Sequence, residues 1–267
     1  MPANFVATSI ATTMTERLRT THKRRGISIF SGPPGIGKTT AIGAFESEFS
    51  GRVAVIKINS TKASIRLVMQ HAVDAMRKIG TQSTGYVYQD ANQIRKQLQN
   101  EIEYWTLGKV GDVEGERFGA FHAPPLTFVF DEAQNLSRGA IEALRYWNDH
   151  DRCYAPFPIG LVFVGNNEFS LKSDRLGQSV ISAAVADRAL FTESFEYADL
   201  TNADIRLFLR AHGIEDEAAI FALVKHYSAP RAIRSLRAVL RNIEALKDEA
   251  DGQAITIDTV RDVLAPA

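Results

Sequence analysis

A glycine-rich segment near the start of the chain has the spacing of a phosphate-binding loop. The segment Gly32-Pro33-Pro34-Gly35-Ile36-Gly37-Lys38-Thr39 fits the pattern G-x-x-x-x-G-K-[ST]. Glycines let the backbone N–H groups approach phosphate oxygens, and a helix N-terminus behind them favours negative charge. We expect Lys38 to reach the β- and γ-phosphates of ATP and Thr39 to bind Mg²⁺. Including Thr40, we call Gly32–Thr40 the phosphate loop.

Two acids follow the apolar run Leu126–Phe130. At the carboxyl end of a parallel strand they would lie where open α/β sheets bind ligands. We expect Asp131 to hold magnesium, usually through its water shell, and Glu132 to orient and deprotonate the attacking water. An Asp-Glu pair after a strand also serves as a helix N-cap, and the phosphate loop favours the catalytic interpretation.

Asparagines follow a second apolar run, Ile159–Gly165. An amide at Asn166 would be able to hydrogen-bond both the γ-phosphate and the attacking water, so we predict that Asn166 is a sensor. The alternative is an asparagine-rich turn, since asparagine is a common turn former.

Bulk composition excludes several classes of protein. Lysine and arginine balance aspartate and glutamate at 31 each, so any anionic partner must be met by a local patch. A single cysteine, Cys153, excludes an internal disulfide and any multi-cysteine metal site. The apolar runs are too short to cross a bilayer. The threonine-rich first 25 residues fit a transit peptide or a plain helix, and we expect a cytoplasmic protein with no membrane partner.

Short apolar runs alternate with helical periodicity through the first 198 residues, which predicts an α/β fold with a parallel sheet flanked by helices. The expected strands and helices are Gly26–Ser31, Lys38–Phe49, Arg52–Asn59, Ser64–Ile79, Thr127–Phe130, Gly139–Asp149 and Gly160–Val164. Thr106–Pro125 holds four glycines and two prolines and is predicted to be a loop insertion.

Only helices are expected in residues 199–267, which we predict to form a small all-helical lid domain. The expected helices are Ala203–His212, Glu217–Tyr227, Arg231–Lys247 and Ile257–Leu264. The first follows a capping signal formed by Thr201 and Asp204.

Together, GPPGIGKT, FVFDEAQNL and IGLVFVGNNEF resemble the AAA+ ATPases, and more narrowly the family of the phage Mu B transposition protein with its TnsC and TniB relatives. Weaker matches are Phe5-Val6, Ala63-Ser64 and Pro230–Leu236. The resemblance implies an ATP hydrolase that uses Mg²⁺ and assembles into rings or helical filaments. The Mu protein carries a helix-turn-helix domain ahead of its ATPase, whereas this chain begins almost directly at the ATPase.

The same resemblance assigns two arginines. Arg188 occupies the position at which the family has an arginine finger, an arginine that contacts the ATP bound by the neighbouring subunit, and Arg175 is the second candidate for this role. The alternative is that Arg188 forms a surface ion pair with Asp187 or Glu193. Arg234 matches the lid sensor that touches ATP phosphates. It belongs to a helical stripe of Arg231, Arg234, Arg237 and Arg241, whose other members either hold DNA phosphate or are solvated.

The family's DNA contacts come after the second strand and in the following helical region. Those segments hold Ser60, Thr61, Lys62 and Ser64, then Arg95 and Lys96. We expect Lys62 first, and then Arg95 and Lys96, to bind DNA phosphates; the alternative is that these are ordinary exposed polar residues. The cluster His22-Lys23-Arg24-Arg25 either faces DNA or is solvated.

The leading hypothesis is an ATP-dependent, sequence-tolerant DNA-binding ATPase that oligomerises on double-stranded DNA, selects target DNA and activates a transposase. One alternative is an AAA+ switch of the ExeA type that remodels a protein partner, because those proteins share a DEAQNL-like segment. Another is a helicase loader, which would prefer single-stranded DNA.

Overall fold

The computed structural model describes residues 5–59, 63–78, 125–148, 159–171, 180–229 and 232–264. The chain divides into two compact units. The sheet unit comprises Thr15–Ser31 and Ile42–Ser194, and the lid unit comprises Met1–Met14, Gly32–Ala41 and Phe195–Ala267. The whole phosphate loop, Gly32–Thr40, therefore clusters with the C-terminal helices. Of the expected loop insertion at Thr106–Pro125, all but Pro125 lies outside the described residues.

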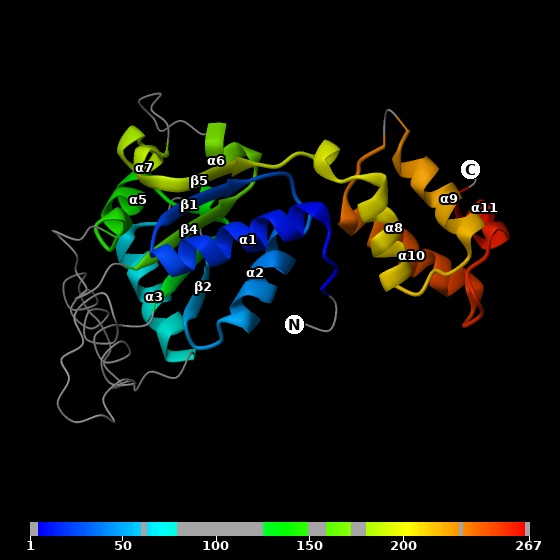
Figure 1. Cartoon of the computed structure of the whole chain (residues 1–267), viewed down its shortest axis with the longest axis horizontal. Coiled ribbons are helices and arrows are strands. Elements are labelled where there is room, and N and C mark those ends of the chain that lie inside the picture. Colours follow the sequence, from blue (N-terminus) through cyan, green and yellow to red (C-terminus); the bar gives the residue numbers. More distant parts are fainter. Residues whose placement is uncertain are drawn as a thin grey trace. The chain divides into compact units, whose positions relative to one another are not determined.

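A five-stranded parallel sheet forms the centre of the sheet unit (Figure 1). Its strands are β1 (Ile27–Ser31), β2 (Val53–Lys57), β3 (Thr127–Asp131), β4 (Gly160–Gly165) and β5 (Ala189–Ser194), in the order β2-β3-β4-β1-β5. All four neighbouring pairs are parallel, which confirms the predicted α/β fold. Strand β5 was not expected from the sequence, because its short run ALFTES contains only two large apolar residues; in the structure every second residue of it is exposed.

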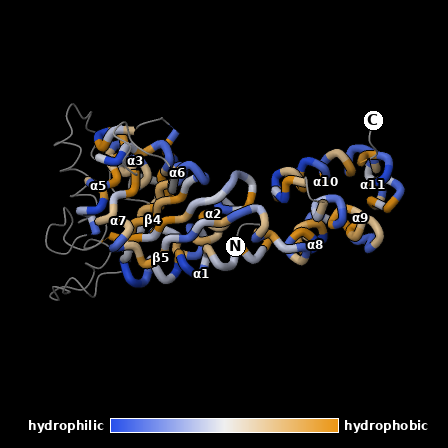
Figure 2. Tube along the Cα trace, turned by 90° about the horizontal axis from the view of Figure 1, so that it is seen from above, coloured by the Kyte–Doolittle hydropathy of each residue, from blue (hydrophilic) through white to orange (hydrophobic). Residues whose placement is uncertain are grey.

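Helices cover both faces of the sheet. One face packs against α3 (Ile65–Lys78), α5 (Arg138–Arg145), α6 (Asn167–Leu171) and α7 (Ala183–Arg188). Phe130 and Phe163 stack within this core, with ring centroids 5.4 Å apart. The opposite face is covered by the sheet-unit parts of α1 (Ser9–Arg24) and α2 (Lys38–Glu48). Hydrophobic residues run along the strands between these layers (Figure 2).

His22 is part of the second face and not of a basic surface. Its side chain is 2% exposed, its Nδ1 lies 2.9 Å from the Thr127 hydroxyl, and its ring contacts Phe49 with centroids 4.4 Å apart. Burial, reinforced by Arg52 and Arg25, lowers the pKa of His22 to about 4. The interpretation of His22 as a DNA-facing member of a basic cluster is therefore wrong, because the ring is buried and neutral at physiological pH.

The lid unit holds the helices that follow residue 200. These are α8 (Asn202–Ala211), α9 (Glu217–Tyr227), α10 (Leu236–Ala250) and α11 (Ile257–Leu264), after the short turn η3 (Tyr197–Asp199). Their shared core includes Leu209, Leu223, Val239 and Leu246. Helix α10 begins five residues later than the sequence predicted, since Ala232–Ser235 is not helical.

The capping signal at the start of α8 is confirmed. The Thr201 hydroxyl accepts the Asp204 N–H at 3.1 Å, and the Asp204 carboxylate accepts the Thr201 N–H at 2.8 Å. Asp204 also accepts the N–H and the hydroxyl of Ser9, at 2.7 and 3.0 Å, which ties the start of α1 to the lid helices. Burial alone would raise the pKa of Asp204, but these hydrogen bonds outweigh it and hold that pKa below its usual value.

No helix within the described ranges is both long enough and apolar enough to span a bilayer.

Candidate functional site

The phosphate loop joins β1 to α2 and has the backbone of an anion cradle. Gly35 and Gly37 have φ of 79° and 101°, in the left-handed region where a side chain is strained. Helix α2 begins at Lys38, immediately after them, so the N–H groups of its first turn follow the loop. This arrangement of glycines and helix N-terminus fits a phosphate group.

Lys38 lies against the main chain of the same loop. Its ammonium donates to the carbonyl oxygens of Gly32 and Pro33 at 2.6 and 2.8 Å. Phosphate oxygens are charged and form stronger hydrogen bonds to an ammonium than neutral carbonyls do. The position of Lys38 therefore suits the predicted contact with ATP phosphates.

The first residues of α10 lie directly beside the phosphate loop. A Cβ atom at Gly35 would be 2.2 Å from the Ser235 hydroxyl oxygen and 3.0 Å from the Cβ of Arg237. Tyr197 adds a hydrogen bond from its hydroxyl to the Pro34 carbonyl at 3.2 Å. Only glycine fits at position 35 in this arrangement.

Arg234 is held inside the lid by three hydrogen bonds. Its guanidinium donates to the carbonyl oxygens of Tyr227 and Leu200 at 3.1 and 3.0 Å, and to the Asn202 side chain at 3.0 Å. Arg237, by contrast, is exposed, and its backbone lies at Gly35. The sensor role of Arg234 stays a prediction. Arg237, which the sequence analysis named only as a member of the arginine stripe, is a second lid arginine at the phosphate loop.

In the sheet unit, the carboxyl ends of three neighbouring strands meet at one edge. Ser31 of β1 is in register with Gly165 of β4, and Asp131 of β3 with Val164. Asp131 is 6% exposed, and one of its carboxylate oxygens accepts the N–H of Glu132 at 3.0 Å. The chain leaves β1 at this same edge and continues into Gly32, the first residue of the phosphate loop.

Glu132 has an unusual backbone for a residue with a side chain. Its φ and ψ are 59° and 40°, in the left-handed region. Such a conformation costs roughly 1–2 kcal/mol in a residue with a Cβ and is concentrated at functional sites. The strain occurs at the residue that the sequence assigned as the general base.

Gln134 contacts both Glu132 and Asn166, which the sequence analysis did not foresee. Its Nε2 donates to a Glu132 carboxylate oxygen at 2.5 Å, and its Oε1 accepts the Asn166 N–H at 3.2 Å. Asn166 uses its own side-chain oxygen to accept the Glu168 N–H at 3.0 Å, within the first turn of α6. The sequence signal was the glutamine two residues after Glu132, but its partner lies 32 residues away.

The structure does not bring the remaining predicted site residues together within the ranges that it describes. Arg188 is the exposed last residue of α7, and its alternative partner Glu193 is paired with Arg17 at 3.3 Å. Thr39 belongs to the lid unit and Asp131 to the sheet unit, so their joint binding of magnesium stays a prediction. Several named residues lie outside the described residues: Ser60, Thr61, Lys62, Arg95, Lys96, Arg175 and Arg231.

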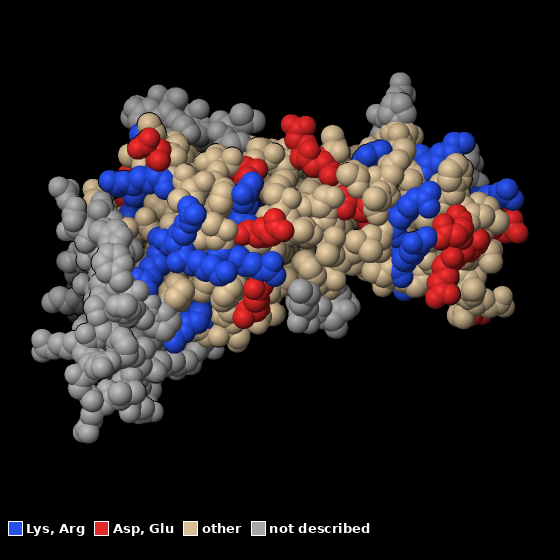
Figure 3. All heavy atoms as spheres, viewed as in Figure 1, with Lys and Arg blue, Asp and Glu red and all other residues tan. Residues whose placement is uncertain are grey.

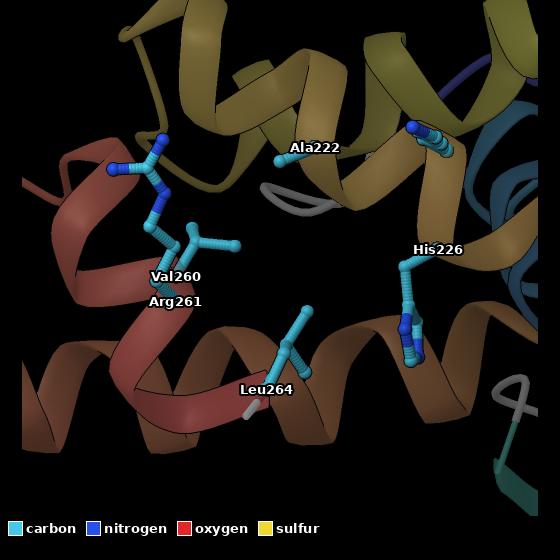
Figure 4. A pocket seen from close by; sticks show the side chains of 6 residues that line it. Ala222, His226, Val260, Arg261 and Leu264 are labelled. Atoms are coloured by element: carbon cyan, nitrogen blue, oxygen red, sulfur yellow. The ribbon is translucent and has the colours of Figure 1, made fainter. Parts of the chain in front are cut away.

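The lid also carries a groove of about 610 Å³ between α9 and α11 (Figure 4). Ala222 and His226 of α9 face Val260 and Leu264 of α11 across it, and Lys225 and Arg261 complete the lining. None of these residues belongs to the phosphate loop or to the acidic edge of the sheet. The groove therefore shares no residue with the candidate nucleotide site.

Comparison with known proteins supports one family. The model of a family described as AAA domain matches residues 20–172, more than half of the chain. No curated protein matches significantly.

Three solved structures share the fold at low identity. CDC6P from Pyrobaculum aerophilum has a TM-score of 0.63 at 15% identity, over 95% of this chain and 65% of that chain. The RuvB Holliday junction branch migration motor of Thermotoga maritima has a TM-score of 0.54 at 15% identity, over 97% of this chain and 69% of that chain. Drosophila ORC bound to DNA has a TM-score of 0.56 at 15% identity, over 99% of this chain and 62% of that chain. This chain spans about two thirds of each. The family match, with the parallel sheet and the phosphate loop, shows that the chain belongs to the AAA+ ATPases.

Proposed function

We propose that the chain is a Mg²⁺-dependent ATP hydrolase that binds DNA through its backbone and assembles on it. The observation that carries the ATPase assignment is the geometry of the phosphate loop. Two glycines with positive φ, a lysine held against the loop carbonyls and a helix N-terminus occur in succession from Gly32 to Lys38. Each of these features favours a bound polyphosphate.

We assign the catalytic roles to residues of the phosphate loop, of the carboxyl edge of the sheet and of α7. Thr39 and Asp131 would hold Mg²⁺, which would neutralise charge on the β- and γ-phosphates when bound. Glu132 would accept the proton of the attacking water, and Asn166 would sense the γ-phosphate. Arg188 would reach the ATP of a neighbouring copy in the assembly, and an arginine supplied in this way contributes on the order of 10³-fold in rate.

DNA binding is supported by a local basic surface on the sheet unit. Figure 3 shows lysine and arginine gathered along α1, although the chain as a whole is neutral. Arg17 and Arg19 pair with Glu193 and Glu48. Within the described residues Lys23 and Arg24 are exposed and form no ion pair. Two structures with the same fold act on or bind DNA by their titles, the RuvB branch migration motor and the DNA-bound ORC.

On the family resemblance, we propose that the role is to select target DNA and activate a transposase. ATP would stabilise an oligomer on duplex DNA, and hydrolysis would dismantle it. Lys62, Arg95 and Lys96 are the proposed phosphate contacts, in addition to the exposed cations of α1.

ATP binding and turnover test the ATPase assignment first. Lys38→Ala should abolish binding of a fluorescent ATP analogue, and Glu132→Gln should bind it normally but hydrolyse ATP at least about 100-fold more slowly. Lys247→Ala is the matched control, because Lys247 is exposed in the last turn of α10. Unchanged ATP binding by Lys38→Ala would refute the assignment.

DNA binding tests the second half of the proposal. Affinity for duplex DNA of unrelated sequences should appear with a slowly hydrolysed ATP analogue and fade with ADP. It should fall steeply between 50 and 200 mM salt, because binding releases condensed cations from DNA and added salt makes that release less favourable. A strict preference for single strands would favour a helicase loader. No DNA binding in any nucleotide state would favour the switch that remodels a protein.

A further inference from the structure

Gln134 is a buried amide whose two ends serve two residues of the proposed catalytic site. It lies in the short turn η2 (Ala133–Asn135) after β3 and is 8% exposed. Its Nε2 donates to the Glu132 carboxylate at 2.5 Å, and its Oε1 accepts the backbone N–H of Asn166 at 3.2 Å. The hydrogen bonds fix the amide orientation: only the oxygen accepts an N–H, and only the nitrogen donates to a carboxylate.

The surroundings hold this amide in one position. A Cβ atom at Gly165 would be 3.1 Å from Gln134 Oε1 and 2.6 Å from the Cβ of Phe169, so the end of β4 packs closely against it. The turn itself is anchored, since Asn135 donates through Nδ2 to the Ile58 carbonyl at 2.8 Å and accepts the Ala63 N–H at 2.8 Å. A side chain fixed in this way loses little further entropy when it orients a neighbour.

The carboxylate of Glu132 therefore has two unequal oxygens. Oε2 is engaged by Gln134, which leaves Oε1 for a proton. Glu132, with its left-handed backbone, is the residue that precedes η2, and Gln134 lies within η2. A general base works when its accepting atom is held within hydrogen-bond reach of the proton that it removes, and a loosely held carboxylate is a poorer base.

We propose that Gln134 is the positioning residue of the general base: it anchors Glu132 through Oε2, leaves Oε1 to accept the proton of the attacking water, and links that carboxylate to the backbone of Asn166. The general base after β3 and the sensor after β4 are thereby kept at a fixed spacing. This inference rests on the proposed function, because it requires Glu132 to be the base.

Two substitutions separate positioning from simple packing. Gln134→Leu keeps the approximate size but removes both hydrogen bonds. Gln134→Glu keeps the size and polarity, and it donates to Glu132 only when its new carboxyl group is protonated. At neutral pH it places a second negative charge beside Glu132 instead.

We expect both variants to bind the fluorescent ATP analogue with an affinity within about two-fold of the parent, because Gln134 orients the base and does not hold the phosphates. Their kcat at pH 8 should fall by about 10- to 100-fold, within the range attributed to general bases. As the pH is lowered from 8 to 6, the kcat of Gln134→Glu relative to the parent should rise, whereas that of Gln134→Leu should not. Gln253→Leu, at an exposed lid position, is the matched control.

A packing role has different consequences. If kcat stays within two-fold of the parent in both variants, or if the relative activity of Gln134→Glu does not depend on pH, the inference is overturned. Should Gln134→Leu fail to fold, the pH dependence of Gln134→Glu decides the matter alone. Failure of the proposed function itself is seen separately, as normal turnover by Glu132→Gln.

Discussion

Gly35 is the position where the structure makes its sharpest prediction. Gly35→Ala would place a Cβ atom 2.2 Å from the Ser235 hydroxyl oxygen and 3.0 Å from the Cβ of Arg237, on a backbone with φ of 79°. The left-handed conformation costs about 1–2 kcal/mol with a side chain present. Displacing tightly packed neighbours adds about 1–3 kcal/mol.

The two costs together amount to about 2–5 kcal/mol. Without nucleotide the loop relaxes to escape this strain, and ATP binding must restore the strained conformation. Because each ~1.4 kcal/mol is a factor of ten, we expect ATP affinity to fall at least about 30-fold. Ser235→Gly in the same chain removes the nearer clash and should restore part of the loss.

Titration with a fluorescent ATP analogue measures the effect, and thermal unfolding shows whether the fold is intact. Gly43→Ala is the matched control, because Gly43 lies in α2, the helix that follows the phosphate loop, with nothing within 4 Å of an added Cβ. That control should bind ATP normally and be slightly more stable, by about 0.5–1 kcal/mol. Wild-type ATP affinity in Gly35→Ala, or equal losses in both variants, would refute the reasoning.

Two further predictions concern the lid and the pH dependence of stability. Arg234→Ala should destabilise the lid by roughly 2–4 kcal/mol in urea unfolding, because three hydrogen bonds are lost. Arg237→Ala should leave the unfolding free energy unchanged and weaken ATP binding. The reverse pattern would show that Arg234 is the phosphate contact. For His22, the folded-state pKa of about 4 lies below the ordinary 6.5, so its contribution is complete above pH 6.5 and is lost as the pH falls toward 4. Between pH 7 and 5 the unfolding free energy should therefore drop by about 1–2 kcal/mol more in the parent than in His22→Gln, and an equal drop in both would contradict the buried, neutral ring.

The proposed DNA contacts of α1 and the proposed nucleotide contacts are different residues, so substitutions can test them independently. Substituting Lys23 and Arg24 should weaken DNA binding without altering ATP turnover in the absence of DNA, since both lie at the end of α1 where β1 begins, and β1 carries the phosphate loop at its other end. Loss of basal ATPase activity in these variants would point instead to a folding defect.

The sequence by itself determined the parts of this protein that depend on local spacing. Phosphate-loop glycines, the acids after β3 and the capping box at Thr201 and Asp204 are each defined within a few residues, so the chain identifies them without knowledge of the fold. The alternation of strands and helices likewise predicted the parallel sheet, because each period is set by neighbours along the chain.

The tertiary structure alone decided which distant residues meet. Gln134 reaches Asn166 because β3 and β4 are adjacent and in register, and Ser235 lies at Gly35 because α10 begins beside the phosphate loop. His22 looked like part of a basic run until packing buried it against Thr127 and Phe49. Contacts of this kind depend on strand register and helix packing, which spacing along one chain does not encode.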